Sequence, residues 1–499
     1  MPQDNVNQSA EFQRRMAEMF RNMPPPPPKP EADDGGQDDG VKTEAKPEEI
    51  RFDMKPEELE AYLNQYVVRQ DRAKEILATK ICTHFNKIRL GEPEDGAGVG
   101  HIKNNILMIG PTGVGKTYLI KLIARRIGVP FVKGDATKFS ETGYVGGDVE
   151  DLVRDLVREA DGDIPRAQVG IIYIDEIDKI AASGSAVGPD VSRTGVQRNL
   201  LKLMEETDVD MRVPHDLASQ MEAMMHFQRT GKIEKKKVNT RNILFIVSGA
   251  FLGLEDRIRK RLHKQTIGFG SEHFGKKAET DVFLKQVKSE DLIEYGFESE
   301  FVGRLPVVAV LDELKEEDLY HILKNPDSSV IVEKKRDFQA YGIEISFEDG
   351  ALRELARKAY QEGTGARGLV SVCEKALLKF EKKLPSTDIK RFVVTKDMVE
   401  NPEMGLARVL TEAPIQQYQE NFFKENGIRL SFTPGAIQRL SDQAAARDGN
   451  IGALCGELLD DYGYGLKLTR EETFEVTEEV LEDPKGFLNR MIKTFYGKK

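Results

Sequence analysis

Short apolar runs alternate with amphipathic stretches of helical periodicity from about residue 51 onward. The runs at residues 105–109, 170–174 and 242–247 are almost continuously apolar, which is typical of strands buried on both faces. Their alternation with helical patterns predicts a parallel α/β sheet. After about residue 315 the strand candidates become rare, and the pattern predicts a region dominated by helices.

Residues 1–50 lack this pattern. A run of five prolines, Pro24 to Pro28, precedes the acidic, glycine-rich stretch EADDGGQDDG. Such a composition buries too little apolar surface to offset the entropy lost on ordering, so we predict a disordered tail. Ahead of the prolines, five apolar residues share one face at helical spacing, which indicates either a short docking helix or a frayed amphipathic segment. They are Phe12, Met16, Met19, Phe20 and Met23.

The last third of the chain contains an internal repeat. Ten residues from Gly342 (GIEISFEDGA) recur from Gly427 (GIRLSFTPGA), at an offset of 85 residues. Phe392-Val-Val-Thr recurs as Phe474-Glu-Val-Thr at an offset of 82, and each is followed by a proline. A shared start and a shared end with a small internal deletion predict duplication of one unit. The alternative is chance similarity between two helix–strand units.

Composition narrows the class of protein. At about 150 residues per domain, 499 residues correspond to roughly three folded units. The 84 acidic and 73 basic side chains give a net charge of −11, which argues against a protein that binds nucleic acid by bulk electrostatics. We therefore expect no nucleic-acid partner, although a local basic loop is compatible with this balance.

The cysteines and the hydropathy favour a soluble, cytoplasmic protein. The three cysteines lie far apart without any CxxC pair, so the sequence supports neither a disulfide framework nor a cysteine-rich zinc module. Cys82 and His84 could offer two metal ligands, but a plain helix explains them better. No apolar run reaches the roughly 18 residues that span a bilayer. The N-terminus lacks the apolar core of a signal peptide.

One glycine-rich segment predicts a nucleotide site. Residues 110–117 fit the P-loop pattern G-x-x-x-x-G-K-[ST] and lie between a buried strand and a helical stretch at 118–127. Backbone N–H groups and the helix N-terminus would surround the phosphates of ATP. Lys116 would neutralise the β/γ oxygens, and the Thr117 hydroxyl would bind Mg²⁺. The predicted nucleotide-binding residues are Gly110, Pro111, Thr112, Gly113, Val114, Gly115, Lys116 and Thr117.

The next apolar run ends in Asp175-Glu176. The carboxyl end of a parallel strand lies at the ligand-binding edge of the sheet. We expect Asp175 to hold Mg²⁺ through water and Glu176 to orient and activate the attacking water. The alternative is a solvated helix N-cap, a role that suits Asp178.

These motifs together resemble the AAA+ unfoldases ClpX and HslU, and ClpX more closely. The resemblance covers about residues 55 to 405 and implies an AAA+ large domain, with a parallel sheet flanked by helices, followed by an α-rich small domain. Residues 188–197 lean toward HslU, whereas residues 267–270 and 365–369 (GARGL) lean toward ClpX. The motifs that carry the resemblance are the P-loop and residues 143–146 (GYVG), 172–179 (IYIDEIDK), 301–306 (FVGRLP) and 363–369 (GTGARGL).

The resemblance implies roles around the nucleotide. Arg304 resembles the arginine finger that reaches the γ-phosphate of a neighbouring subunit, and Arg367 resembles the sensor arginine of the small domain. The loop of Tyr66, Val67 and Val68 resembles the wall that packs on adenine. It is followed by Arg69, where the family usually has glycine. Ser248, at the end of its strand, is a candidate sensor residue.

The same resemblance implies contacts with polypeptides. Tyr144 and Val145, between two glycines, resemble the pore loop that grips a protein substrate. The basic stretch at residues 227–237 corresponds to a second pore loop, or is a solvated lysine face. Ile267, Gly268 and Phe269 resemble the loop that docks on the peptidase ClpP, although an internal packing loop or another partner is an alternative.

The sequence departs from ClpX at both ends of the resemblance. The zinc-binding N-terminal domain of ClpX has no counterpart here, so we expect different adaptors and substrates. In the second repeat unit, Gly452 or Ala453 stands opposite Arg367, so this copy cannot contact nucleotide charge. We predict a binding or ring-stabilising module.

The expected function is an ATP-dependent unfoldase that threads polypeptides through a hexameric ring for a ClpP-like peptidase. The alternatives are a stand-alone remodelling chaperone and a nucleotide-dependent scaffold. The intact Glu176, Arg304 and Arg367 argue against the scaffold. The predicted domains are the tail at 1–50, the large ATPase domain at 51–315, the small domain at 316–408 and the repeat at 409–499.

Overall fold

The computed structural model describes residues 52–90, 103–140, 147–182, 191–211, 236–266, 280–327, 329–447 and 450–497. Several predictions concern segments outside these residues. They are the N-terminal tail with its apolar face, the loop at 143–146, the docking residues 267–269, and the basic stretch at 227–237 except its last two residues.

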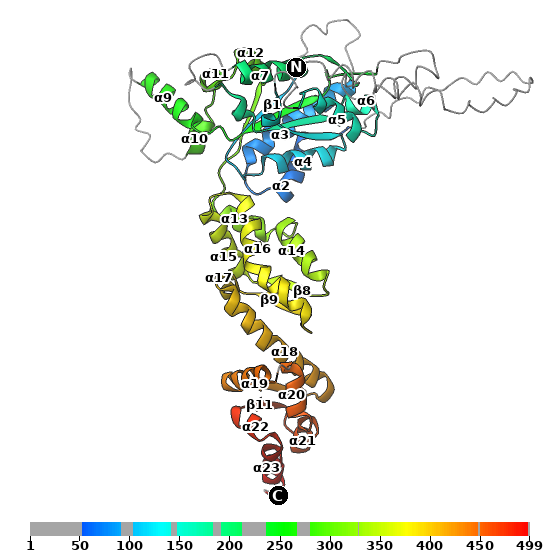
Figure 1. The fold of residues 1–499 in the computed structure, drawn as a ribbon, viewed down its shortest axis with the longest axis vertical. Coiled ribbons are helices and arrows are strands. Elements are labelled where there is room, and N and C mark those ends of the chain that lie inside the picture. Colours follow the sequence, from blue (N-terminus) through cyan, green and yellow to red (C-terminus); the bar gives the residue numbers. More distant parts are fainter. Residues whose placement is uncertain are drawn as a thin grey trace, which may run out of the picture. The chain divides into compact units, whose positions relative to one another are not determined.

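A five-stranded parallel sheet forms the centre of the first folded part, in the order β2-β3-β6-β1-β7 (Figure 1). The three predicted strands are β1, β3 and β6, each within two residues of the expected bounds, so the predicted parallel sheet is confirmed. The two edge strands were not predicted, because neither is a continuous buried run. The strands are β1 (Ile106–Ile109), β2 (Phe131–Asp135), β3 (Ile171–Asp175), β6 (Leu244–Gly249) and β7 (Val307–Val310).

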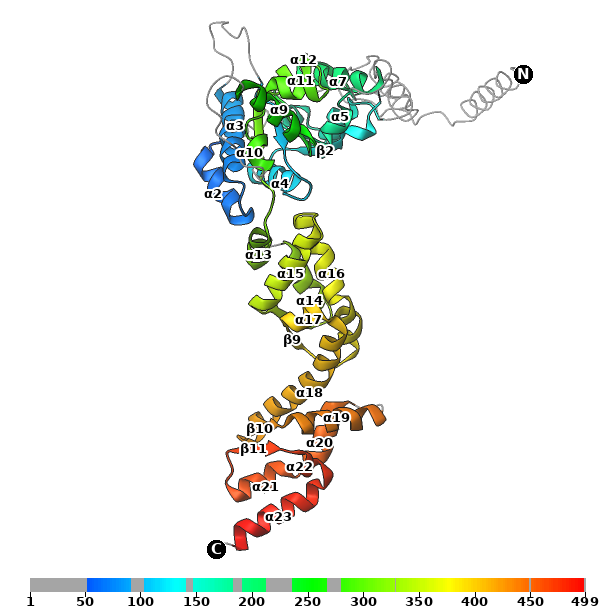
Figure 2. The ribbon, with the colours of Figure 1, turned by 90° about the vertical axis from the view of Figure 1, so that its left-hand side faces the viewer.

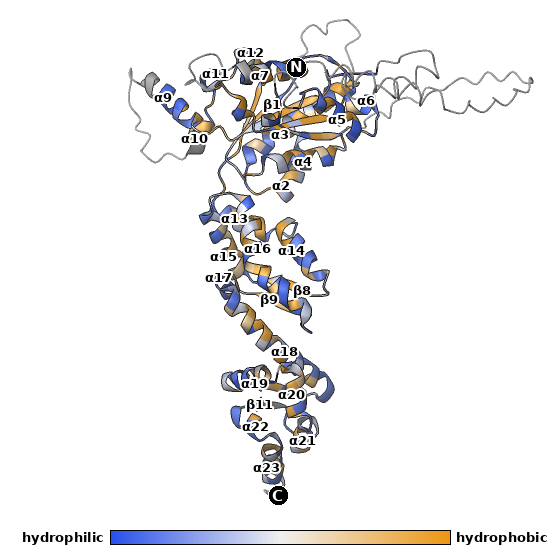
Figure 3. Ribbon diagram, viewed as in Figure 1, coloured by the Kyte–Doolittle hydropathy of each residue, from blue (hydrophilic) through white to orange (hydrophobic). Residues whose placement is uncertain are grey.

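The sheet is covered on both faces, which explains its continuously apolar strands (Figure 3). Successive side chains of a strand point to opposite faces. Ile106 and Met108 of β1 accordingly join one buried cluster with α2 (Pro56–Tyr66), α3 (Asp71–Leu90) and α4 (Lys116–Ile127). Leu107 and Ile109 join a second cluster, which includes α5 (Asp151–Glu159), α7 (Val191–Met204) and α9 (Leu254–Thr266).

Shorter elements complete this part of the chain. The strands β4 (Asp208–Asp210) and β5 (Lys237–Asn239) pair in a two-stranded antiparallel sheet. The remaining elements are the 3-10 turns η1 (Ala136–Lys138) and η2 (Ile177–Ile180) and the helices α6 (Ile164–Ala167), α10 (Thr280–Leu284), α11 (Ser289–Tyr295) and α12 (Ser299–Gly303).

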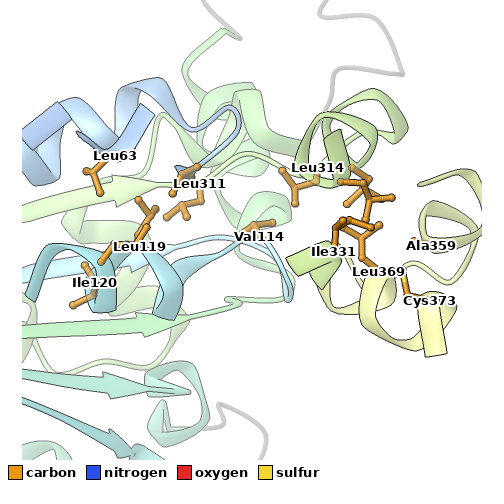
Figure 4. Packing of buried hydrophobic residues seen from close by; sticks show 14 of the residues in the cluster. Leu63, Val114, Leu119, Ile120, Leu311, Leu314, Ile331, Ala359, Leu369 and Cys373 are labelled. Carbon is orange, nitrogen blue, oxygen red and sulfur yellow. The ribbon is translucent and has the colours of Figure 1, made fainter. Parts of the chain in front are cut away.

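Helices dominate after residue 315, as predicted. The small strands β8 (Glu344–Phe347) and β9 (Arg391–Val394) pair in parallel, and the helices around them share the buried cluster of α2 to α4. Figure 4 shows this cluster passing from Leu119 and Val114 through Leu314 to Leu369 and Cys373. The helical elements are α13 (Glu316–Lys324), α14 (Ser329–Gln339), α15 (Asp349–Gln361), α16 (Ala366–Lys383), η3 (Leu384–Ser386) and α17 (Lys396–Glu400).

The sequence repeat corresponds to a repeated fold. The strands β10 (Arg429–Phe432) and β11 (Thr473–Val476) also pair in parallel (Figure 2). Ile345 pairs with Phe392 in the first unit and Leu430 with Phe474 in the second, which reproduces both sequence offsets in the register. The helices of the second unit are α19 (Pro434–Ala446), α20 (Ile451–Leu459), α21 (Tyr462–Thr469), α22 (Glu478–Glu482) and α23 (Pro484–Gly497).

The helix α18 (Pro402–Asn426) connects the two units without interruption. Its Val409 belongs to the cluster shared with the sheet, whereas Ile415 and Phe422 belong to the buried cluster of the C-terminal unit. The expected domain boundary after residue 408 therefore lies inside a continuous helix. No helix in the described ranges is both long and apolar enough to cross a membrane.

Candidate active site

The P-loop connects β1 to α4 and turns directly into the helix. Gly115, at φ 96°, precedes Lys116, which is the first residue of α4. The Lys116 ammonium donates to the carbonyl oxygens of Gly110 (2.7 Å) and Pro111 (2.8 Å). Burial lowers the pKa of Lys116, although the carboxylates of Asp175 and Asp178 oppose this effect.

A cavity of about 430 Å³ lies beside this loop, a size typical of small-ligand sites. Most of the residues predicted to bind nucleotide line it, although they come from four separate segments of the chain. The predicted residues in its lining are Tyr66, Val67, Val68, Thr112, Gly113, Val114, Gly115, Lys116, Thr117, Asp175, Glu176 and Arg367.

Asp175 ends β3 inside a set of polar contacts. Its Oδ1 accepts a hydrogen bond from Ser248 (2.7 Å), and its Oδ2 accepts one from the Thr117 hydroxyl (3.2 Å) and lies 3.3 Å from the Lys133 ammonium. Burial by itself would raise the pKa of Asp175, but the Ser248 hydrogen bond and the Lys133 charge outweigh it and hold this pKa below its usual value. The carboxyl group is therefore ionised at neutral pH.

Glu176 adopts an uncommon backbone conformation. Its φ of 58° and ψ of 32° lie in the left-handed region, which is uncommon for a residue other than glycine. Such residues cluster at functional sites, where the surrounding structure holds them. Asp178 is buried and accepts a hydrogen bond from the Ala250 amide (3.3 Å), so it is not the solvated helix cap considered from the sequence.

Arg69, which replaces the usual glycine, anchors the loop predicted to pack on adenine through two ion pairs. Arg69, at φ 61°, is left-handed, a conformation that costs a non-glycine residue roughly 1–2 kcal/mol. Its guanidinium lies 2.8 Å from the Asp318 carboxylate and 3.7 Å from that of Asp312. Gln70 bonds both backbone groups of Asp312. These contacts offset the strain and join the loop after α2 to the segment that leads into α13.

The turn before α16 contacts the P-loop directly. The Ala366 amide donates to the Gly113 carbonyl (2.9 Å). A Cβ on Gly113 would stand 2.1 Å from the Thr364 oxygen, so only glycine permits this approach. Arg367 is thereby brought to the cavity. In the repeat, Asn450 of the matching turn caps α20 and donates to Asp388 (2.7 Å).

Arg304 is not among the residues that line this cavity. Its side chain is 54% exposed and forms an ion pair with Glu205 (2.5 Å). Asn105 donates to its backbone carbonyl (3.1 Å) and so fixes the end of α12 against the sheet. Within one subunit, the structure therefore separates this arginine from the P-loop residues.

Comparison with known proteins agrees with this geometry. A family described as "AAA domain (Cdc48 subfamily)" matches residues 102–308, and one described as "C-terminal, D2-small domain, of ClpB protein" matches residues 314–384. Two proteins named "ATP-dependent Clp protease ATP-binding subunit ClpX", from Borrelia duttonii (strain Ly) and Borrelia recurrentis (strain A1), are each 41% identical over 349 residues. The match covers 69% of this chain and 78% of each relative. The chain belongs to the ClpX family.

As a member of the ClpX family, the chain is an AAA+ ATPase that binds and hydrolyses ATP. Sequence reasoning missed several parts of its ClpX-type site. Lys133 and the Tyr173 hydroxyl both reach the Asp175 region, and Tyr173 is signalled only by being a polar-tipped residue within an apolar run. Burial raises the pKa of Tyr173 to about 12.

The apolar part of the cavity was also missed, because it comes from segments without a motif. It includes Tyr118, Leu252, Leu314, Ile322, Val330 and Val370. Cys82 and His84 are buried in α3, where His84 Nε2 lies 3.0 Å from the Asn242 carbonyl. Among the described residues, no group of three or more His, Cys, Asp or Glu side chains is arranged to hold a metal ion.

Proposed function

We propose that the chain is an ATP-driven protein unfoldase that threads polypeptides through a homo-hexameric ring in the cytoplasm. The observation that carries the proposal is the convergence of Lys116, Glu176 and Arg367, from three separate segments, on one cavity. A cavity assembled in this way responds to nucleotide with movement of the segments that line it. That coupling is the physical requirement of a machine that converts hydrolysis into pulling.

In the proposed reaction, Lys116 neutralises charge on the phosphates and Glu176 accepts a proton from the attacking water. Thr117 and Asp175 are suited to Mg²⁺, because a hydroxyl and an ionised carboxylate 3.2 Å apart form a hard oxygen donor set. When bound, the ion supplies charge neutralisation at the β- and γ-phosphate oxygens. Arg367 contacts the nucleotide from the small-domain side.

Arg304 completes the site of a neighbouring subunit in this proposal. Its separation from its own cavity and its exposed guanidinium support a role across a subunit interface. An arginine finger is worth about 10³–10⁵ in rate in GTPases, so an isolated subunit turns over ATP very slowly. Assembly into a ring is therefore a condition for activity.

Tyr144 and Val145 grip the substrate polypeptide, and Ile267, Gly268 and Phe269 dock on a ClpP-like peptidase. The support is the sequence resemblance together with the relatives named as subunits of an ATP-dependent Clp protease. We assign residues 51–315 to the large domain and 316–408 to the small domain. Residues 1–50 and 409–499 then serve adaptor or partner contacts. The second candidate is a remodelling chaperone without a peptidase.

Two variants test this function with a folded, tagged substrate. Tyr144→Ala is expected to spare ATP hydrolysis and abolish unfolding, because the loop loses its aromatic grip. Tyr341→Ala is the matched control, since Tyr341 is 56% exposed between α14 and β8, outside the segments proposed to contact partners. Unfolding that persists in Tyr144→Ala would contradict the proposed pore loop.

The partner is tested by isolating the assembled protein from its native cell with ATP present. We expect a ClpP-like peptidase to co-purify, and deletion of residues 267–269 to abolish this association while unfolding continues. If the intact ring unfolds the substrate but retains no peptidase, the remodelling chaperone is the correct function.

A further inference from the structure

A buried tyrosine hydroxyl lies at the centre of the polar contacts around Asp175. Tyr173 is fully buried in β3, two residues before Asp175. Its hydroxyl lies 2.6 Å from Ser248 Oγ on the neighbouring strand β6 and 3.1 Å from Thr117 Oγ1 at the start of α4. Three elements that carry the proposed metal and phosphate chemistry therefore meet at one phenol.

Counting hydrogens assigns a direction to this network. Ser248 and Thr117 each have one hydroxyl hydrogen, and each donates it to an oxygen of Asp175, at 2.7 Å and 3.2 Å. Neither can then donate to Tyr173. The phenol must be the donor, and its shorter contact is with Ser248. The resulting chain runs from Tyr173 to Ser248 and from Ser248 to Asp175.

We propose that Tyr173 is a positioning residue for Mg²⁺: its hydroxyl fixes the rotamer of Ser248, and Ser248 fixes the carboxylate of Asp175. This inference rests on the proposed function, in which Asp175 and Thr117 hold the ion. Ser248, the candidate sensor in the sequence, thereby has a defined role. It does not line the cavity and acts on it through Asp175.

The physical reason is the freedom of a carboxylate at the end of a strand. An aspartate side chain has other rotamers that would turn its oxygens away from Thr117, and each restraint on them lowers the entropy lost when the ion binds. Partners behind a metal ligand typically contribute 10–100-fold to metal affinity. Tyr173 acts one hydrogen bond farther away than Ser248, so its effect belongs at the lower end of this range.

The test measures ATP affinity by calorimetry against Mg²⁺ concentration, in full-length protein carrying Glu176→Gln so that turnover does not interfere. Tyr173→Phe is expected to raise, by about 10-fold, the Mg²⁺ concentration at which the increase in ATP affinity is half complete. ATP affinity in EDTA is expected to stay unchanged. Ser248→Ala should produce at least the same shift, the double variant should add little to it, and Ser248→Thr should retain wild-type behaviour.

The matched control is Tyr320→Phe, which removes another phenol of a buried tyrosine that donates to a carboxylate, Asp349; neither residue lines the cavity. It should leave the Mg²⁺ dependence unchanged. An equal ATP weakening of Tyr173→Phe with and without Mg²⁺ would overturn the inference in favour of a structural role. If Tyr173→Phe does not fold, the Mg²⁺ dependence of Ser248→Ala is compared with that of Ser248→Thr. The inference requires a shift in the first variant and none in the second.

Asp175→Asn tests the proposed Mg²⁺ site separately from the positioning role of Tyr173. If Asp175→Asn abolishes the Mg²⁺ dependence and Tyr173→Phe leaves it unchanged, the positioning inference alone is wrong. If Asp175→Asn itself has no effect on the Mg²⁺ dependence, the proposed metal site is wrong, and the inference fails with it.

Discussion

Arg304 and Lys103 are two basic residues with different exposure, and the difference determines which contacts each can form. Arg304 is half exposed and its pair with Glu205 is solvated, so that contact contributes at most about 1 kcal/mol and leaves the guanidinium available to a partner. Lys103 is more buried and donates to the carbonyls of Glu205 and Thr240, each at 2.6 Å. Lys103 therefore stabilises the backbone at Glu205, the residue whose side chain pairs with Arg304.

The first prediction concerns Arg304 as a residue that acts across an interface. Arg304→Ala should reduce ATP turnover by about 10³-fold while leaving ATP affinity unchanged, because the charge is lost only from the transition state. Mixing Arg304→Ala subunits with Glu176→Gln subunits should restore turnover above either parent. Mixed rings contain interfaces with an intact Glu176 on one side and an intact Arg304 on the other.

Arg391→Ala is the control for Arg304, because Arg391 is also an exposed arginine paired with a carboxylate, Glu344. It should retain full turnover. If mixing the two inactive variants recovers nothing, Arg304 acts within its own subunit or only stabilises the fold.

The second prediction is a pH dependence from Lys103. Burial lowers the pKa of Lys103 to about 7, with the Glu206 carboxylate opposing this effect and the Arg304 charge reinforcing it. The unfolded chain keeps this proton to about pH 10.4, so between pH 7 and pH 10 it binds more protons than the folded chain. The free energy of unfolding should therefore rise with pH in this window, by up to about 1.4 kcal/mol per pH unit.

Lys103→Met should remove this rise, in addition to a pH-independent loss of the two hydrogen bonds that the ammonium donates to the carbonyls of Glu205 and Thr240. Urea unfolding of both proteins between pH 7 and pH 9 measures the difference in slope. Lys379→Met, at a half-exposed lysine of α16, should keep the wild-type slope. A constant difference between wild type and Lys103→Met would mean that Lys103 titrates normally.

At the scale of elements, the turn before α16 packs so closely against the P-loop that no side chain fits between their backbones. Gly365 has φ 61° and ψ −145°, a region essentially restricted to glycine, and a Cβ there would stand 2.8 Å from the Gly113 oxygen. The obstacle is backbone and cannot rotate away. This contact is what delivers Arg367 from α16 to the cavity beside α4.

The third prediction is that Gly365→Ala weakens ATP binding about 10-fold, because strain of about 1–3 kcal/mol is relieved only by breaking the bond from Ala366 to Gly113. Calorimetry without Mg²⁺ measures this effect apart from the metal site. Gly363→Ala is a closely matched control, since Gly363 has φ 65° but open space around its Cβ position. Equal weakening by both variants would assign the effect to backbone strain alone.

The elements also show why some features were predictable from sequence and others were not. The strands β1, β3 and β6 are central and buried on both faces, so each is a continuous apolar run that needs no context. The edge strands have one neighbour and mixed burial, and their sequences do not separate them from loops. The P-loop and Asp175-Glu176 carry their chemistry in adjacent residues, and the sequence locates both.

Contacts between distant segments leave no such local signal. The hydroxyl chain from Tyr173 joins residues 56 and 75 positions away in sequence, and its geometry depends on the order β3-β6-β1. In the sequence, Arg69 is only a departure from the glycine that the family usually has, because its partners Asp312 and Asp318 lie some 240 residues downstream. Only the folded chain shows that ion pairs stabilise Arg69 in the left-handed conformation that glycine adopts without strain.

At the scale of the whole chain, the repeat is a folded unit with a buried cluster of its own. Within the described residues, Leu440, Leu466 and Val476 form a core distinct from the one that joins the sheet to α13–α17. Its turn at Asn450 bonds Asp388 of the first unit, whereas the corresponding turn of the first unit bonds the P-loop. The second unit thus repeats the parallel strand pairing of the first, but its turn contacts the neighbouring unit and not the P-loop.

The fourth prediction follows from this separation. A chain that stops after Ala413 keeps Val409 and the turns of α18 that cover the first core, and loses every residue of the second. Calorimetry should therefore find ATP affinity within about twofold of the full chain, since no cavity residue is removed. If the repeat stabilises the ring, sedimentation should show assembly only at higher protein concentration, because a set of contacts between subunits is lost. A large loss of ATP affinity would instead mean that the repeat still supports the nucleotide cavity, and its missing arginine would then be no measure of its role.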